Sequence, residues 1–574
     1  MKKVVVGIDF GTSGIGYAYG FFGKDQNSII LSDLPGQGAD NKVPSEIILD
    51  NKFKDILSFG VDCKGYINTH KKCDYEYFKE IKMNLYKNNY LIKSTNGNEI
   101  DIEIIITKML QKISENAISQ IKRADKSITK EDIKWIVTIP AIWEEKSKNI
   151  MIKSSINAGL IDENTDKSLF LALEPEVAGI YYFKSSLINS SYISSQIFEK
   201  CPICDIGAGT VDICTHKRII ENNETSELSE EYPPIGGDYG GNKINEEFIK
   251  RLIVEIFGEE KVKKLQNESF DNEDLDRFEK EIEEKKISFC NNESSNLILD
   301  CNLFQDDSVK RTLEDYISEY QKKNLKHKYK IRKKRRWELE FESRIFADII
   351  KELSEKIFAK IEEIYNNNNK IGNIILTGAG SKNHVIVHNF YNFAKEKNMK
   401  IEIETPPNPE ISIMKGAVLF GFQSNIIRKR KAKYTLGVGA SKEWDIKYEG
   451  KGNKFYDEVQ KKYYCINTFS KFITKNEYIE FNAEIKREYK AKKQNPAIIF
   501  YKTSKENCTF VDEKDENGEL IIEEFGKVIF DFREDFYIND ADFIMTMNLG
   551  GTYVDVSAIY KRTGKLLKTT QYFY

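Results

Sequence analysis

The sequence predicts an α/β chain that is followed by a smaller antiparallel β part. Two turns of one design, each an apolar strand that runs into Asp-x-Gly, lie far apart in the chain at Asp9 and Asp205. In the segment 107–122, apolar residues recur at helical spacing. From residue 434 onward this spacing gives way to alternation and short apolar runs, at 497–501, 527–532 and 543–547. The change of period predicts a second, all-β region.

The two turns share a composition that suits anion binding. They supply Asp9, Gly11, Thr12 and Ser13 from the first copy and Asp205, Gly207, Ala208, Gly209 and Thr210 from the second. Glycines leave room for backbone N–H groups to close on a phosphate. An aspartate at each strand end could hold hydrated Mg²⁺, which keeps most of its waters and takes few carboxylates. A plain Asp/Gly hairpin explains one copy equally well, but the matched pair indicates a duplication that grips a phosphate chain from both sides.

The pair of turns resembles the two phosphate loops of the actin-like ATPase superfamily. Further segments resemble the heat-shock protein 70 chaperones in the family's own order, and together they span nearly the whole chain: 43–48, 77–86, 136–141, 173–179, 374–381 and 409–421. The resemblance implies a helix over 144–158, after the segment 136–141. The glycine cluster at 236–241 and the segment 415–421 look most like the divergent heat shock 70 kDa protein 12 branch. The resemblance implies a two-lobed actin-like ATPase domain with ribonuclease H-like sheets at 1–427, a basic linker at 428–433, and a small antiparallel β-sandwich at 434–574.

The resemblance also implies a catalytic set: Asp9, Lys82, Glu174, Asp205 and Asp212. Asp9 and Asp205 would hold Mg²⁺ through water. Lys82 fits the family's catalytic lysine best and Lys79 second, although most lysines in such a chain are merely solvated. Glu174 precedes a proline at a helix start, where it could equally serve only the helix dipole.

Nucleotide contacts are implied in the same way. The expected residues are Gly11, Thr12, Ser13, Gly207, Ala208, Gly209, Thr210, Gly236, Gly237, Glu283, Lys286, Gly378, Ala379, Gly380 and Lys382. Glu283 and Lys286 match the pair that clamps adenosine in the family, yet helices contain many Glu/Lys pairs that only support one another. Ala379 stands where the family has a glycine, and Lys382 where an arginine often stacks on adenine.

The expected function is that of an Hsp70-like chaperone ATPase. It binds ATP or ADP with Mg²⁺, and K⁺ as a further cation, and hydrolyses ATP slowly to switch a C-terminal β-domain that binds a polypeptide client or protein partner. The basic linker and the end of the chain at Tyr574, with no helical lid after the last strands, favour as an alternative a nucleotide-binding scaffold with little hydrolysis. An actin-like small-molecule kinase and a filament-forming relative are further alternatives, for which the β tail is unexpected.

Composition narrows the partners and the compartment. The net charge is −3, with 87 Lys and Arg against 90 Asp and Glu, which gives no overall attraction to nucleic acid or membranes. The basic stretch 322–336 could bind either, but we expect a solvated helical extension. Nine cysteines without a secretory signal predict a reduced, cytoplasmic protein, and no apolar run would span a membrane. Cys201 and Cys204 read as structural thiols, and a monomer is expected.

Overall fold

The computed structural model describes the chain apart from residues 1, 25–27, 39, 162–167, 187–199, 222–223, 269–272, 290–295, 306–310, 324–328, 368–370, 407, 451, 459, 492–493, 533–541, 550 and 574. The chain is α/β, with several sheets, and divides into two compact units. Unit 1 comprises Met1–Ile142, Ser154–Ile213 and Ile235–Phe422, and unit 2 comprises Trp143–Lys153, Cys214–Pro234 and Gln423–Tyr574. In the described part of the chain, no helix is both long and apolar enough to cross a membrane.

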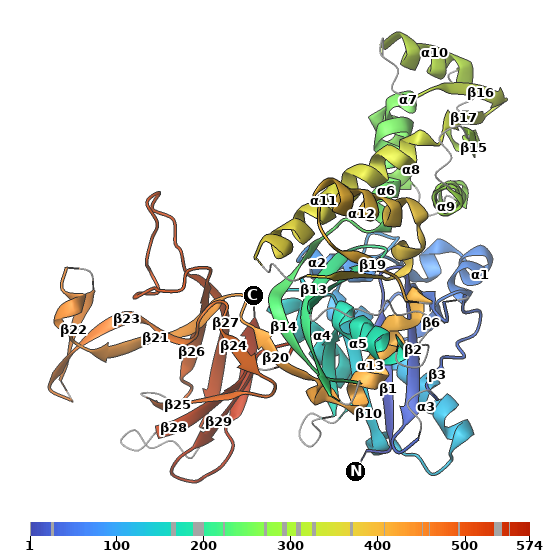
Figure 1. Ribbon diagram of the computed structural model, residues 1–574. Coiled ribbons are helices and arrows are strands. Elements are labelled where there is room, and N and C mark those ends of the chain that lie inside the picture. Colours follow the sequence, from blue (N-terminus) through green and yellow to red (C-terminus); the bar gives the residue numbers. More distant parts are fainter. Residues whose placement is uncertain are drawn as a thin grey trace. The chain divides into compact units, whose positions relative to one another are not determined.

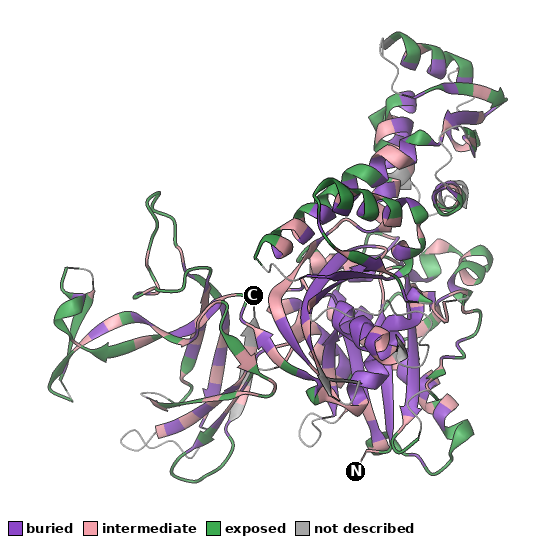
Figure 2. Cartoon of the chain, viewed as in Figure 1, coloured by how far each residue is buried: buried purple, intermediate pink, exposed green. Residues whose placement is uncertain are grey.

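The first sheet of unit 1 has the order β11-β10-β1-β2-β3, and β4 also pairs with β2. Its strands are β1 (Val4–Phe10), β2 (Gly14–Phe21), β3 (Ile30–Leu31), β4 (Val43–Pro44), β10 (Ile133–Ile139) and β11 (Leu169–Leu173). Strand β1 is parallel to β10 and antiparallel to β2. Every residue of β1 is buried, which Figure 2 shows in purple, so its apolar run reflects a strand covered on both faces.

Helices of unit 1 cover this sheet (Figure 1). Helix α13 (Ser412–Phe422) packs on β1 and on α5 (Glu174–Ser186). The helix predicted over 107–122 is confirmed as α3 (Ile102–Ala124), and that over 144–158 as α4 (Glu145–Asn157). The smaller elements of this part are β5 (Ile47–Leu49), β6 (Ile56–Phe59), α1 (Asp62–Thr69), β7 (Glu76–Phe78), α2 (Ile81–Tyr86), β8 (Leu91–Lys93) and β9 (Glu99–Asp101).

A second set of parallel strands in unit 1 carries the other predicted turn. Strand β12 (Lys200–Ile206) is parallel to β18 (Asn373–Thr377), which is parallel to β19 (Glu402–Glu404). The register pairs Asp205 with Thr377, so the ends of β12 and β18 lie together. The helices that follow are α6 (Gly241–Phe248), the π-helix η3 (Ile249–Val254), α7 (Glu255–Phe257), α8 (Glu259–Glu268), α9 (Glu273–Ser288), α10 (Leu313–Lys323), α11 (Arg344–Asn367) and α12 (His384–Glu396).

The basic stretch at 322–336 does not continue as the helix we expected. Residues 324–328 lie outside the described residues, and β16 (Ile331–Arg335) is a strand between α10 and β17 (Glu338–Glu342). Strand β17 also pairs with β15 (Asn296–Asp300). The register sets Arg332 opposite Glu340, and their side chains form an ion pair of 2.6 Å. Opposite charges across a strand pair stabilise the sheet, and this pairing overrides the local helical signal.

Unit 2 contains most of the C-terminal strands. One sheet has the order β22-β23-β21-β26-β27-β30 and a second has β25-β28-β29. The strands are β21 (Thr435–Glu443), β22 (Asn453–Asp457), β23 (Lys462–Ile473), β25 (Glu484–Lys490), β26 (Ala497–Thr503), β27 (Glu523–Asp531), β28 (Asp542–Asn548), β29 (Asp555–Tyr560) and β30 (Lys568–Phe573). Phe530 of one sheet and Phe543 and Met545 of the other belong to one buried cluster. The three predicted strands are confirmed as β26, β27 and β28.

The segment that the sequence analysis treats as a linker forms strand β20 (Ile427–Lys431) in unit 2. It runs parallel to β14 (Glu224–Gly237) and antiparallel to β24 (Tyr478–Glu480). Its Arg428 pairs with Glu227 at 2.8 Å. Acidic residues of β14 therefore compensate a charge that the sequence alone leaves unexplained, while the predicted domain boundaries stay a prediction.

Candidate functional site

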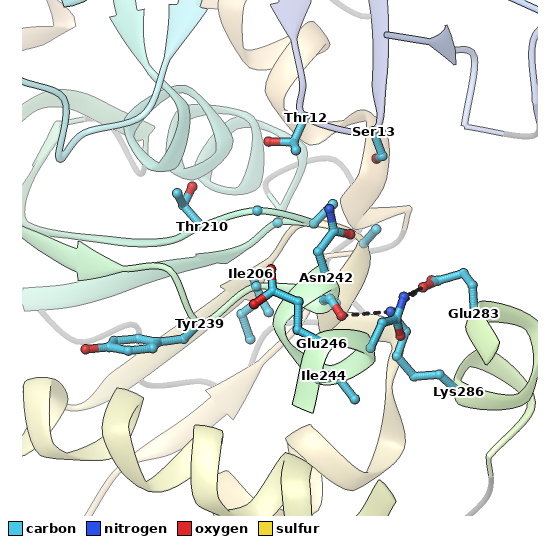
Figure 3. A pocket seen from close by; sticks show the side chains of 18 of the residues that line it. Thr12, Ser13, Ile206, Thr210, Tyr239, Asn242, Ile244, Glu246, Glu283 and Lys286 are labelled. Atoms are coloured by element: carbon cyan, nitrogen blue, oxygen red, sulfur yellow. Dashed lines mark hydrogen bonds and ion pairs between the residues drawn. The ribbon is translucent and has the colours of Figure 1, made fainter. Parts of the chain in front are cut away.

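A pocket of about 1140 Å³ lies in unit 1. Four glycine-bearing segments line it: the turn after β1, the turn after β12, the start of α6 and the turn after β18. The sequence-predicted residues that line it are Asp9, Gly11, Thr12, Ser13, Lys82, Glu174, Asp205, Gly207, Ala208, Gly209, Thr210, Glu283, Lys286, Gly378, Ala379, Gly380 and Lys382. Figure 3 shows Thr12 and Ser13, from the first turn, around the same pocket as Thr210 from the second.

The two predicted turns approach each other closely. A Cβ atom built on Gly209 would lie 2.8 Å from the Thr12 hydroxyl oxygen, so a larger residue would push the turns apart. The N–H of Gly207 donates to the Thr210 carbonyl at 3.0 Å and closes the second turn. The N–H of Asn242 donates to the Ala208 carbonyl at 2.8 Å, which fixes the start of α6 against that turn.

Three buried carboxylates line the pocket, and the buried carboxylate of a fourth residue interacts with them electrostatically. Asp9 and Asp205 stand near the ends of β1 and β12, and Glu174 is the first residue of α5. Asp212, the fourth, stands in β13 (Val211–Glu221) and accepts a hydrogen bond from the Ile142 N–H at 3.1 Å. Lys82 of α2 forms a short ion pair with Glu174. The structure therefore brings together all five residues predicted as catalytic.

Burial and mutual repulsion raise the pKa values of Glu174 and Asp205. Burial, together with the charges of Asp9 and Asp212, raises the pKa of Glu174 to about 7 although Lys82 opposes the shift. Burial and the charges of Glu174, Asp212 and Asp9 hold the pKa of Asp205 well above its ordinary value. Negative charge at this end of the pocket exceeds what the neighbouring lysines compensate.

These residues fit a hydrated magnesium ion. Oδ1 of Asp205 is buried and accepts no hydrogen bond from the described residues. A divalent cation would compensate that oxygen and lower the repulsion among the four carboxyls. Within the described ranges, no three His, Cys, Asp or Glu residues gather as a direct ligand set. The donor set therefore suits Mg²⁺ held by few carboxylates and several waters.

A second group of polar residues lies at the start of α6 and in α9 (Figure 3). The Lys286 ammonium donates to Glu283 at 2.5 Å and to the Gly241 carbonyl at 3.0 Å. Glu283 also accepts from the Asn245 amide at 2.7 Å. Glu283 and Lys286 therefore do not only stabilise α9, because their hydrogen bonds also join α9 to α6. Lys382, in the turn after β18, instead pairs with Glu410 at 2.7 Å and is half exposed.

Three predicted residues are not part of this pocket lining: Asp212, which is described above, and two glycines. Gly236 and Gly237 stand in β14, while the neighbouring Gly240 and Gly241 line the pocket. A Cβ added to Gly236 would clash with the Val211 carbonyl and would lie 3.1 Å from the Ile142 side chain.

Cys201 and Cys204, the predicted structural thiols, are both buried in β12. Burial and the charge of Asp205 hold the pKa of the Cys204 thiol well above its ordinary value. A thiol of this kind is a poor nucleophile.

Comparison with known proteins finds relatives of one kind that align with most of the chain. Mouse and human heat shock 70 kDa protein 12A are 23% and 24% identical to it over 582 residues, which cover 88% of this chain and 82% of each relative. Human heat shock 70 kDa protein 12B is 22% identical over 549 residues, covering 85% of this chain and 78% of the relative. The chain resembles the heat shock 70 kDa protein 12 branch. No family model matches it.

The resemblance predicted from the sequence, including that to the heat shock 70 kDa protein 12 branch, is confirmed. One pocket residue was nevertheless missed. Lys42 directly precedes the Val-Pro-Ser segment quoted for the family, and its ammonium lies 2.6 Å from Oδ2 of Asp9. Burial alone would lower the pKa of Lys42, but Asp9 and its hydrogen bond raise it, so the group is an ammonium. Its adjacency to a matched motif was the available signal.

Proposed function

We propose that this chain is an Hsp70-like ATP-binding protein that hydrolyses ATP slowly, on an actin-like two-lobed core. One observation carries the proposal: glycine-bearing turns from four segments surround one pocket that is also lined by three buried carboxyls, those of Asp9, Glu174 and Asp205, and by the lysines Lys42 and Lys82. Backbone amides suit phosphate oxygens, and lysines neutralise the charge that develops on a transferred phosphoryl group.

Each residue has a role in this proposal. Amides of 11–13 and 207–210 would hold the phosphate chain, and Lys82 would contact the terminal phosphate. Glu174 and Asp212 would orient the attacking water by accepting its hydrogen bonds. Asp9 and Asp205 would hold Mg²⁺ through water, and the ion would supply charge neutralisation on the phosphates. Lys286 with Glu283 would contact the adenosine, and the turn at 378–380 would leave room for the flat base.

The C-terminal strands would bind a partner differently according to the nucleotide that is bound in the pocket. We propose that they form a β-sandwich that binds an extended peptide or a protein partner, in the cytoplasm. Chain continuity supports a link: β13 leaves the second phosphate turn at Val211, and from Cys214 onward its residues belong to unit 2. Ile142, whose N–H holds Asp212, directly precedes the unit 2 segment Trp143–Lys153.

The test is ATP turnover by the full chain with Mg²⁺, in the wild type and in Asp205→Asn. The exposed Asp55→Asn serves as a matched control, since Asp55 lies outside the pocket. Slow turnover that disappears only in Asp205→Asn, and that changes when a permanently unfolded carboxymethylated protein is added, supports the proposal. ATP turnover that is equal in all three proteins would contradict it.

A nucleotide-binding scaffold with little hydrolysis is the second candidate. It is favoured by the ion pair that holds Lys82 on Glu174, because a lysine retained there would not reach the terminal phosphate. Tight ATP binding without turnover would select this candidate. In that case Lys82→Met would leave the dissociation constant for ATP unchanged.

A further inference from the structure

Lys42 stands in the phosphate end of the pocket as a second buried ammonium. Its Nζ lies 2.6 Å from Oδ2 of Asp9, and the two side chains are only 15% and 2% exposed. Asp205 also contributes to the electrostatic field at Lys42. The lysine therefore pairs with one of the two carboxylates that are proposed to hold the magnesium ion.

The backbone around Lys42 holds it in this position. Its carbonyl accepts from the Gly38 N–H at 2.9 Å, and its N–H donates to Asp40 at 3.3 Å. The next residue, Val43, pairs with Ile15 of β2. A Cβ on Gly16 would lie 3.1 Å from the Lys42 Cγ, so the aliphatic stem lies against a glycine of that strand. An ammonium on a stem fixed in this way is preorganised and loses little freedom on binding.

We propose that Lys42 is a resident cation of the phosphate site, whose ammonium joins Asp9 to the phosphate chain of a bound nucleoside triphosphate. Binding of the nucleotide then does not require a divalent metal. This inference rests on the proposed ATP binding and concerns how the charge of the phosphates is met. Mg²⁺ remains necessary for turnover, because Asp205 is not compensated by this lysine alone.

The donor count supports this role. An ammonium has three N–H donors, and the contact with Asp9 uses one of them. Lys42 lines the same pocket as Gly11, Thr12 and Ser13, so donors directed into the pocket can reach phosphate oxygens held by that turn. Lys82, by comparison, is held by Glu174. Lys42 is thus the lysine tied to the first turn.

The experiment measures the dissociation constant of a fluorescent ATP analogue for the full chain, once in Mg²⁺ and once in EDTA. The variants are Lys42→Met, which keeps the aliphatic stem, and Lys42→Arg, which keeps the charge. Lys93→Met is the matched control, because Lys93 is a 68% exposed lysine outside the pocket. The double variant Asp9→Asn/Lys42→Met removes both charges and guards against misfolding of the single variant. Thermal melts check folding.

For the wild type, we expect the dissociation constant to rise by less than about threefold in EDTA. Lys42→Met should weaken binding about tenfold or more in EDTA, since a hydrogen bond from a charged donor is lost, while Lys42→Arg and Lys93→Met remain near wild type. The double variant should need Mg²⁺ as Lys42→Met does.

Wild-type binding that is present in Mg²⁺ and lost in EDTA would overturn the role of Lys42 and leave the proposed ATP binding intact. Binding in EDTA that Lys42→Met retains would overturn it as well. Absence of binding under both conditions would instead refute the proposed function, and this inference with it.

Discussion

The two Asp-x-Gly turns have the same sequence design but different electrostatic surroundings. Asp9, near the end of β1, is paired with the ammonium of Lys42 at 2.6 Å. Asp205, near the end of β12, is equally buried, and its Oδ1, like Oδ2 of Asp9, accepts no hydrogen bond within the described part of the chain, so the ion pair with Lys42 is what distinguishes Asp9. Three other carboxylates raise its pKa well above the ordinary value, in addition to burial.

The two turns therefore share a sequence motif, but the charge of the aspartate is balanced by a lysine in the first turn only. The compensating group of the first turn is Lys42, whereas Gly378 lies beside Asp205 in the second. We therefore regard the first turn as prepared for phosphate by the protein, and the second as dependent on a bound cation. The predictions below test that contrast.

The largest effect is expected on turnover. Asp205→Asn should reduce ATP hydrolysis on the order of 10²–10³-fold, as the loss of a preorganised charge-positioning group does. The free energy of unfolding of the nucleotide-free protein should not fall, because the substitution removes an uncompensated buried charge. Steady-state hydrolysis and urea denaturation measure the two quantities. A fall in the free energy of unfolding with unchanged turnover would mean that Asp205 stabilises the fold and does not act in hydrolysis.

The next effect concerns stability at the first turn. Asp9→Asn should lower the free energy of unfolding by about 3–5 kcal/mol, because it leaves the Lys42 ammonium buried without its carboxylate. Urea denaturation of the nucleotide-free protein checks this. The double variant Asp9→Asn/Lys42→Met should recover most of the loss. If Asp9→Asn and Asp205→Asn are equally stable, the contrast between the turns is wrong.

A smaller effect is expected from pH. The folded Glu174 carboxyl keeps its proton up to a pKa of about 7, whereas in the unfolded chain it titrates near 4.5. Unfolding therefore releases a proton between these values, and the free energy of unfolding falls as pH rises through that window. Denaturation series from pH 4.5 to 7 in the absence of nucleotide measure the slope. Glu174→Gln should reduce the slope of the free energy of unfolding against pH. An unchanged slope in this variant would mean that other groups cause the pH dependence.

The smallest effect on the free energy of unfolding is expected at Gly378. This glycine has a φ of +78°. A Cβ added to it would lie 2.6 Å from the Ile206 carbonyl oxygen, close to Asp205. Gly378→Ala should cost on the order of 1–2 kcal/mol from backbone strain, and more from the close contact. Gly23 has φ of +79° and open space around it, so Gly23→Ala measures the strain alone. Equal losses in the two variants would mean that the turn beside Asp205 adapts freely.

Local patterns predicted much of the fold. The apolar period of 107–122 predicted α3, and the short apolar runs after residue 434 predicted β26, β27 and β28. Strand β16 was missed because its stability comes from the pairing of Arg332 with Glu340. Strand β20 was missed for the same reason, since its basic residues meet the acidic residues of β14, about 200 positions earlier in the chain.

Residues of the pocket lining were predicted where a motif recurs, and one was missed where its partner is distant in the sequence. The matched turns identified Asp9 and Asp205 from their spacing, and the family resemblance identified Lys82 and Glu174. Apart from its position beside the matched segment 43–48, no local signal distinguishes Lys42 from other lysines, because its role depends on how β4 pairs with β2 beside Asp9. Charge pairing across the fold is a tertiary property that neither periodicity nor motif spacing encodes.

The most direct measurement is a crystal structure of the full chain with a non-hydrolysable ATP analogue and Mg²⁺. We predict phosphates between the turns at 11–13 and 207–210, a metal ion bound through water to Asp205, and the Lys42 ammonium within hydrogen-bond distance of both Asp9 and a phosphate oxygen. A nucleotide bound outside this pocket would contradict the account. So would phosphates in the pocket that contact neither turn.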